Sequence, residues 1–136
     1  MGSYTGFPLA RQAVGIYVPS VALGTNLSAA VGRRSMFVQV GDMVVVYGEC
    51  DLTPTLAIDT VTRFRISLPV PSQFDDIDDA TGQFSTSIDG AVGILKARVV
   101  APLELAATIL AKHMTTERYT FQAMYTVKPP PAPVEG

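Results

Sequence analysis

The chain is poor in the residues that cross-link or hold metals: its 136 residues include one cysteine, one histidine and no tryptophan. A single cysteine cannot form an intrachain disulfide, and a structural zinc site needs several Cys or His ligands. We therefore interpret Cys50 as a small buried hydrophobic residue rather than a reactive thiol. His113 lies in a predicted turn without a second histidine as partner, so we expect it to be exposed to solvent.

Charged residues are also scarce, at 16% of the chain, whereas an ordinary soluble domain has about 25%. Hydrophobic residues make up 48%. This imbalance indicates that part of the apolar surface is covered by other subunits. The net charge is −2, which provides no basic field for the phosphates of a nucleic acid, so nucleic acid is not an expected partner.

Targeting and membrane signals are missing as well. The first residues do not combine a basic segment with an apolar one, as an export signal would, and no apolar run is long enough to span a membrane. We therefore expect a protein made in the cytoplasm, with no membrane partner. The chain length predicts one domain that buries roughly two-thirds of the surface of its unfolded chain.

No segment carries a recognisable catalytic motif: the sequence has neither a glycine-rich phosphate loop nor a G-x-S-x-G elbow. Glu49 and Asp51 project from the same strand face and imitate the carboxylate pair of a glycosidase, but they lie at a strand end, where charge usually means surface. We expect no enzymatic activity and no cofactor.

Four aspartates in the segment 73–82 offer oxygen atoms to a cation: Asp75, Asp76, Asp78 and Asp79. Their spacing lacks the glycine and the terminal glutamate of an EF-hand loop. We interpret the segment as a solvated acidic loop and expect no metal site.

The most informative stretch runs from Ser35 to Pro71. Two apolar runs meet at Gly41-Asp42, a favoured turn dipeptide, and a third run, 61–68, follows. Apolar side chains alternate with polar ones, which is the pattern of antiparallel strands with one face in the core. This pattern predicts the following core residues: Val38, Val44, Val46, Phe64, Ile66 and Leu68.

Further strands are predicted after the acidic loop. Residues 83–88 and 91–99 flank Asp89-Gly90, a second hairpin signal. Residues 118–127 alternate well and add Phe121 and Tyr125 to the predicted core. Residues 103–112 are ambiguous, because their composition favours a helix whereas their short length and their position between strands favour a strand. We predict a strand there, with the helix as the alternative.

The two ends of the chain do not have the strand pattern. Residues 1–14 contain two glycines and a proline with scattered apolar side chains and no clear period, and we interpret them as an arm in which Tyr4, Phe7 and Leu9 contact a partner. Residues 128–136 are rich in proline and predict an extended tail. The domain itself is expected to span residues 15–127.

A set of short strings resembles a β-module of tailed-bacteriophage virion proteins. These strings are G-I-Y-V-P at residues 15–19, F-V-Q-V-G-D-M-V-V-V-Y-G at 37–48, P-T at 54–55, R-I-S-L-P-V-P-S at 65–72, G-A-V-G-I-L-K-A at 90–97 and F-Q-A-M-Y-T-V at 121–127. The match covers about Tyr17 to Val127. Gln39, where a basic residue is usual, and Tyr47, where serine is usual, depart from the pattern.

The resemblance implies an all-β, antiparallel β-sandwich that is jelly-roll-like, forms homotrimers and lies on the virion surface. It implies a capsid decoration (cement) protein without enzyme activity, whose partners are its own copies and the major capsid protein or other virion proteins. The alternative is a tail-fibre or head-fibre module that recognises a host surface glycan through loops such as Gln73 to Gly82.

Overall fold

The fold was analysed in a computed structural model that describes residues 12–56, 59–86 and 92–129. Within these residues the chain forms ten strands and one short 3-10 helix, η1 (Ile77–Asp79). The strands are β1 (Gln12–Tyr17), β2 (Val21–Thr25), β3 (Leu27–Gly32), β4 (Ser35–Val40), β5 (Met43–Pro54), β6 (Thr60–Ile66), β7 (Ala80–Ser85), β8 (Val92–Ala97), β9 (Leu105–Ala111) and β10 (Glu117–Thr126). No helix among the described residues has the length and apolar character needed to cross a membrane.

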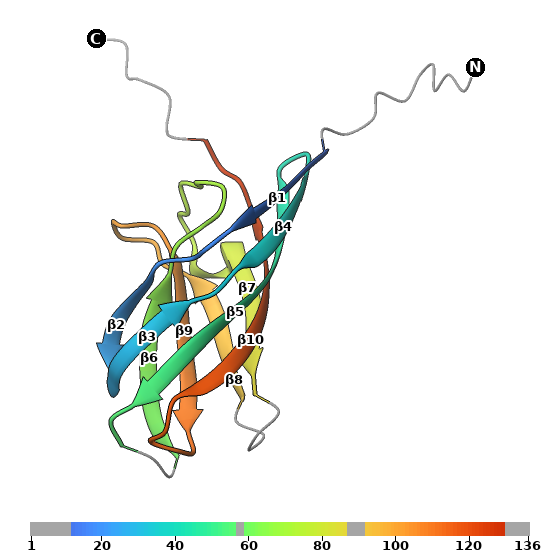
Figure 1. The fold of residues 1–136 in the computed structure, drawn as a ribbon. Helices are drawn as coiled ribbons and strands as arrows, with labels where there is room; N and C mark the ends of the chain where they lie inside the picture. The colour runs from blue at the N-terminus through green and yellow to red at the C-terminus, as the bar shows by residue number, and fades with distance from the viewer. Residues whose placement is uncertain (1–11, 57–58, 87–91, 130–136) are drawn as a thin grey trace, which may run out of the picture.

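All strands belong to one antiparallel sheet that curls on itself (Figure 1). The order is β1-β4-β5-β10-β7-β8-β9-β6-β2, and β3 pairs with β5 beside β4. Because the sheet curls, its two halves face each other and enclose a core. The all-β antiparallel fold expected from the sequence is thus confirmed, with the two layers formed by halves of one continuous sheet.

β5 is the central strand of the front layer. Its alternation buries Val44, Val46, Cys50 and Leu52, none of which is exposed. β10 pairs with it from Met43↔Thr126 to Leu52↔Glu117. On its other edge β5 pairs first with β4 and then with β3. Gly41 provides the turn between β4 and β5 with a φ of +59°, a conformation that favours glycine.

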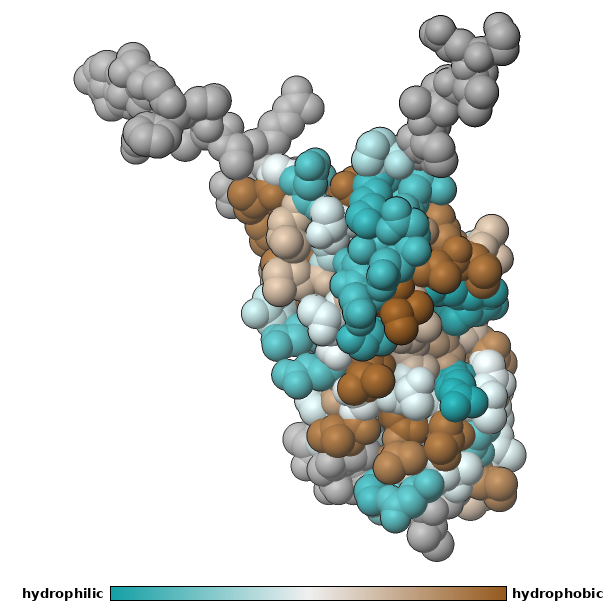
Figure 2. All heavy atoms as spheres, turned by 180° about the vertical axis from the view of Figure 1, so that it is seen from behind, coloured by the Kyte–Doolittle hydropathy of each residue, from teal (hydrophilic) through white to brown (hydrophobic). Residues whose placement is uncertain are grey.

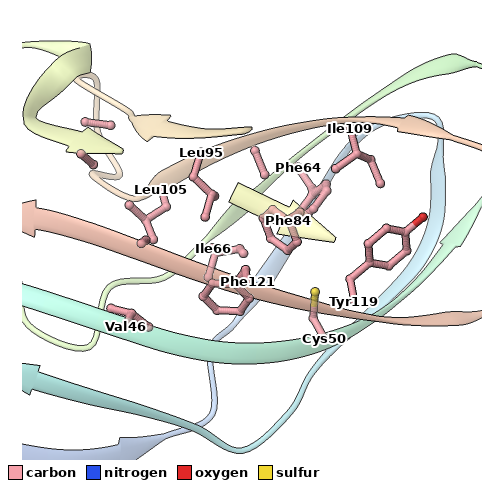
Figure 3. Packing of buried hydrophobic residues seen from close by; sticks show 14 of the residues in the cluster. Val46, Cys50, Phe64, Ile66, Phe84, Leu95, Leu105, Ile109, Tyr119 and Phe121 are labelled. Carbon is pink, nitrogen blue, oxygen red and sulfur yellow. The ribbon is translucent and has the colours of Figure 1, made fainter. Parts of the chain in front are cut away.

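Aromatic side chains from both layers meet in the core (Figure 3). The ring centroids of Phe64 and Phe84 lie 5.2 Å apart, and those of Phe84 and Phe121 lie 5.1 Å apart. These separations are typical of favourable aromatic pairs. Phe84 of β7 therefore links Phe64 of one layer to Phe121 of the other.

Most of the core predicted from the sequence is present. Six of its side chains are at most 3% exposed: Val44, Val46, Phe64, Ile66, Phe121 and Tyr125. Leu68 is partly buried against the cluster. Residues 105–111 form strand β9, so the helix alternative for that segment is wrong.

The prediction for Val38 is wrong, because the opposite face of β4 is turned to the core. Val38 is partly exposed and lies outside the core cluster, whereas Phe37 packs against it. Both faces of β4 are apolar, so the sequence did not distinguish them. The ring of Phe37 occupies the space beside Gly15, where an added Cβ would lie 2.4 Å from its Cε1 atom.

Several other details differ from the expectations. Residues 12–14, assigned to the arm, form the start of β1 and pair with β4. The segment 21–32 forms two strands, joined at Asn26 with a φ of +61°. Phe74, which lies in the segment interpreted as a polar loop, is 5% exposed and packs on Tyr125. The predicted turn at Asp89-Gly90 lies outside the described residues, although the hairpin of β7 and β8 is present.

Candidate interaction surface

The outward face of β1, β4, β5 and β10, with β7 at its edge, is made mainly of apolar side chains. The strand register places them in two neighbouring rows across the sheet. One row contains Ile16, Met36, Tyr47, Gln122 and Gln83. The other contains Val14, Val38, Val45, Met124 and Thr81. We call these two rows the outer apolar face.

The outer apolar face is exposed although it is hydrophobic. Val14 is 67% exposed, Ile16 56%, Tyr47 55%, Met36 52% and Met124 43%. Neither row contains a charged residue. A contiguous apolar patch of this kind usually marks a binding surface, because single exposed hydrophobic residues are normal but clusters of them are not.

Two shallow hollows lie on the outer apolar face. A hollow of about 630 Å³ is lined by Ile16, Met36 and Tyr47 together with polar residues of β7 and β10, and Arg34 and Glu49 line it as well. A second, of about 440 Å³, is lined by Val45, Met124 and Tyr47. Both hollows are lined by Tyr47, Gln83 and Gln122, so these three side chains lie between the two hollows. Hollows of this size can accept side chains of a partner.

The opposite side of the molecule differs. There, hydrophobic residues are interspersed with hydrophilic ones, and hydrophilic residues gather in a band in the upper half of the view (Figure 2). Leu110 of β9 is one of the exposed apolar residues outside the two rows, at 43%.

Glu49 and Asp51, the carboxylates that imitate a catalytic pair, are bound by arginines. Asp51 accepts hydrogen bonds from Nε of Arg118 at 2.5 Å and from Nε of Arg33 at 2.9 Å. Arg118 also contacts Glu49 at 3.2 Å. The hydrogen bond from Arg118, followed by that from Arg33, lowers the pKa of Asp51. Asp51 is therefore held as a carboxylate in a surface ion-pair network.

The aspartates of the acidic loop stabilise the loop itself. Asp76 caps η1 by accepting a hydrogen bond from the Asp78 backbone N–H at 2.8 Å. The Asp79 carboxylate accepts hydrogen bonds from the backbone N–H groups of Asp75 and Asp76. Lys128 Nζ lies 2.8 Å from Asp75 and 3.0 Å from Asp79. Across the described ranges, no group of three or more His, Cys, Asp or Glu side chains is placed to hold a metal ion.

The remaining candidates are distinguished by their burial. Cys50 is fully buried, and burial, together with the nearby Asp51, raises the pKa of its thiol to about 12. Nδ1 of His113 lies 3.2 Å from Oε1 of Glu117, and the His113 side chain is half exposed. Tyr4, Phe7 and Leu9, the predicted partner contacts of the arm, lie outside the described residues.

The domain has two distinct ends. At one, which we call the terminal end, Gln12 of β1 pairs with Val40, and Met43 pairs with both Val40 and Thr126 of β10 (Figure 1). The first described strand therefore begins where the last one finishes. The acidic loop also lies there, because the backbone N–H of Gln73 donates to the Lys128 carbonyl oxygen.

The other end, which we call the loop end, carries the β2–β3 turn and the β5–β6 and β9–β10 connections (Figure 1). Asn26 organises it: its side chain accepts a hydrogen bond from the Leu56 N–H at 2.6 Å and donates to Thr62 Oγ1 at 2.8 Å. Leu56 and Met114 expose apolar side chains there, at 59% and 57%.

Sequence reasoning missed the outer apolar face. The sequence does contain a signal for this face, because apolar residues occupy both sides of β4 and β5. The same pattern is typical of strands that are buried on both sides, so the sequence alone did not show that one side is exposed.

No protein-family model matches the chain, and no curated protein matches it. Among solved structures, it is similar to a reovirus attachment protein, sigma1, which was crystallised in complex with alpha-2,3-sialyllactose. The TM-score is 0.51 and the sequence identity 14%, over 85% of this chain and 66% of that one. The chain thus spans just under two thirds of the sigma1 chain, and what the two proteins share is the fold.

Proposed function

We propose that this chain is a non-enzymatic virion-surface protein, attached to the particle through its terminal end and binding the host surface through its loop end. The observation that carries the proposal is that the two ends of the domain differ: β1 begins and β10 finishes at the same end. Segments that continue from these strands start on one side, so they can engage the particle together. The loop end then points away from it.

Two resemblances support a viral role. The sequence strings resemble virion modules of tailed bacteriophages, and the fold is similar to that of a viral attachment protein that was crystallised with a sialylated sugar. We therefore propose a host surface glycan as the ligand. The residues that carry this contact are those of the loop end, where Leu56 and Met114 are exposed.

The acidic loop is a poor place for this contact, although the sequence suggested it. Its four aspartates repel an anionic sugar. All four also serve internal contacts: Asp76 caps η1, Asp75 and Asp79 pair with Lys128, and Asp78 pairs with Lys96. The loop is also tied to the terminal end through Lys128. Glycan binding at the loop end is therefore the better proposal.

Binding of the purified full-length chain to an array of host surface glycans tests this proposal. Met114→Asp should weaken binding, because it places a charge among the exposed apolar side chains of the loop end. Ile77→Asp is the matched control, since Ile77 is 54% exposed in the acidic loop. Absence of glycan binding, or equal loss in both variants, contradicts a glycan site at the loop end.

A capsid decoration role is the second candidate, and the shared terminal end favours it as well. A protein that covers a capsid needs its anchoring segments on one side, and Tyr4, Phe7 and Leu9 would give the N-terminal segment apolar area to bury. Adding the purified protein to undecorated capsids tests this role. Removal of residues 1–11 leaves β1 intact and should abolish binding; unchanged binding would contradict the role of the arm.

A further inference from the structure

The larger hollow of the outer apolar face combines an apolar wall with a polar wall. The apolar wall consists of three exposed side chains: Ile16, Met36 and Tyr47. The polar wall is the next row along the strands, in which the register places Thr120 opposite both Glu49 and Ser85. A ligand that fits both walls has one apolar side and one side that forms hydrogen bonds.

Several polar groups of the hollow have no partner within the protein. Across the described ranges, the side chains of Gln83, Gln122 and Arg34 form no hydrogen bond or ion pair. Glu49, by contrast, pairs with Arg118 at 3.2 Å. The hollow therefore offers free amide donors and one guanidinium group whose charge no carboxylate offsets.

A polyproline II segment has the chemistry that this hollow requires. Its backbone carbonyl groups form no internal hydrogen bonds, so they are free to accept from side-chain donors. Proline has no N–H group, so no backbone donor is left unpaired against an apolar wall. Grooves lined by aromatic side chains are a recurrent binding site for such segments.

The chain itself contains a segment of this kind. Residues 130–136 lie outside the described residues, and their sequence is P-P-A-P-V-E-G. From β4 across β5 and β10 to β7, the hollow spans three strand spacings, about 14 Å, which is the length of about five residues of polyproline II. Residues 130–134 match this length. If the last of them lies at β4, Glu135 meets Arg34, which directly precedes β4.

This segment cannot fill the hollow of its own chain. Lys128 is held at the terminal end, where its N–H donates to Ser72 Oγ at 2.8 Å and its carbonyl oxygen accepts from the Gln73 N–H at 2.9 Å. Gln122, in the hollow, precedes Lys128 by six residues of extended chain, about 20 Å. Residues 130–136 extend only about 22 Å, so they cannot return over this distance and then cross the hollow. An occupant with this sequence therefore comes from another copy.

We propose that the larger hollow binds residues 130–136 of a neighbouring copy as a polyproline II segment. The proline rings lie against Tyr47, the backbone carbonyl groups accept hydrogen bonds from Gln83 and Gln122, and Glu135 pairs with Arg34. The contact joins the terminal end of one copy to the side of the next. It goes beyond the proposed function, because it involves neither a capsid nor a glycan.

The test is the binding of a fluorescent peptide of residues 128–136, amidated at its C-terminus, to the full-length protein, measured by fluorescence anisotropy. We expect saturable binding. Tyr47→Ala should raise the Kd of the peptide roughly tenfold or more, because it removes the aromatic side chain of the apolar wall. Leu23→Ala is the matched control outside the face, since Tyr47 is 55% exposed and Leu23 50%. Circular dichroism establishes that each variant is folded before its Kd is compared.

The ion pair gives a second, independent measurement. Arg34→Gln in the protein and Glu135→Gln in the peptide should each raise the Kd, and the two together should raise it no further, because both remove the same pair. Arg63→Gln, which changes an exposed arginine of β6, should leave the Kd unchanged. A peptide in which serine replaces every proline should bind more weakly, since it is no longer preorganised.

Cross-linking in the full-length protein tests whether the segment reaches another copy. When Val134→Cys is mixed with Met36→Cys under mild oxidation, a disulfide-linked product of the two variants should form, and mass spectrometry identifies it. Leu23→Cys replaces Met36→Cys in the control, because their side chains are 50% and 52% exposed. Cys50 is fully buried and does not compete.

Three results would overturn the proposal: no saturable binding of the peptide, equal Kd values for Tyr47→Ala and Leu23→Ala, or equal cross-linking of Val134→Cys to Met36→Cys and to Leu23→Cys. If Tyr47→Ala unfolds, the Arg34 and Glu135 measurements decide in its place.

Discussion

The hydroxyl of Tyr125 joins the end of β10 to the segment that follows β6, and its removal tests how the terminal end is held. Tyr125 Oη donates to the Val70 carbonyl oxygen at 2.7 Å and accepts from the Val70 N–H at 3.1 Å. Its ring packs on Phe74 with a centroid separation of 5.6 Å. Tyr125→Phe keeps the ring and removes both hydrogen bonds.

The expected loss of stability is about 1–2 kcal/mol, because two backbone groups of Val70 lose their partner while Val70 itself is only partly buried. With a typical urea m-value, the unfolding midpoint should fall by roughly 0.5–1 M without a change in slope. Burial raises the pKa of Tyr125 to about 12. Since the folded pKa lies above the unfolded value of 10.0, the stability from this group is present below that pH and is lost as the pH approaches 12.

Urea unfolding followed by circular dichroism, at one protein concentration, measures the difference. Tyr47→Phe is the control, because Tyr47 is 55% exposed and its hydroxyl makes no hydrogen bond within the described residues. An equal shift in both variants, or no shift in Tyr125→Phe, would refute the reasoning. Raising the pH from about 10 to 12 should also shrink the difference between wild type and Tyr125→Phe.

Two further predictions concern the groups beside β5. Asp51→Asn should cost about 1–2 kcal/mol at pH 7, because it weakens the hydrogen bonds from Arg118 and Arg33. The arginines lower the pKa of Asp51, so this stability is present above the unfolded value of 3.8 and is lost as the pH falls below it. A difference in urea midpoint that is the same at neutral and at strongly acid pH would contradict this. The Cys50 thiol is fully buried, and its pKa is raised to about 12. It should therefore resist an aromatic disulfide reagent in the native protein and react in denaturant. Rapid labelling of the native protein would contradict its burial.

Much of the sheet could be predicted from local pattern. Along β10 the apolar and polar side chains alternate over ten residues, and a slip of one residue would turn its buried side chains to solvent. β5 adds the same alternation between buried and more exposed positions. Gly41-Asp42 marks the connection between β4 and β5 by its turn preference. These features depend on neighbours along the chain, so the sequence carries them directly.

Other features depended on contacts between distant segments. Strands β2 and β3 lack a clear alternation and exist because β6 and β5 pair with them. Phe74 stands among polar residues and is buried only because Tyr125 of β10 lies beside it. Neither contact could be inferred from the residues around these positions.

The amino-acid sequence by itself determined an antiparallel β-domain, its main strands and most of its core, because those follow from the period of two in side-chain direction. Only the tertiary structure decided which side of β4 faces inward. Val38 and Phe37 are both apolar, and the curl of the sheet, with Gly15 making room for the Phe37 ring, placed Phe37 on the core side. The same choice turned Met36 and Val38 outward beside Tyr47 and Met124, and so placed Val38, which the pattern assigns to the core, on the outer apolar face.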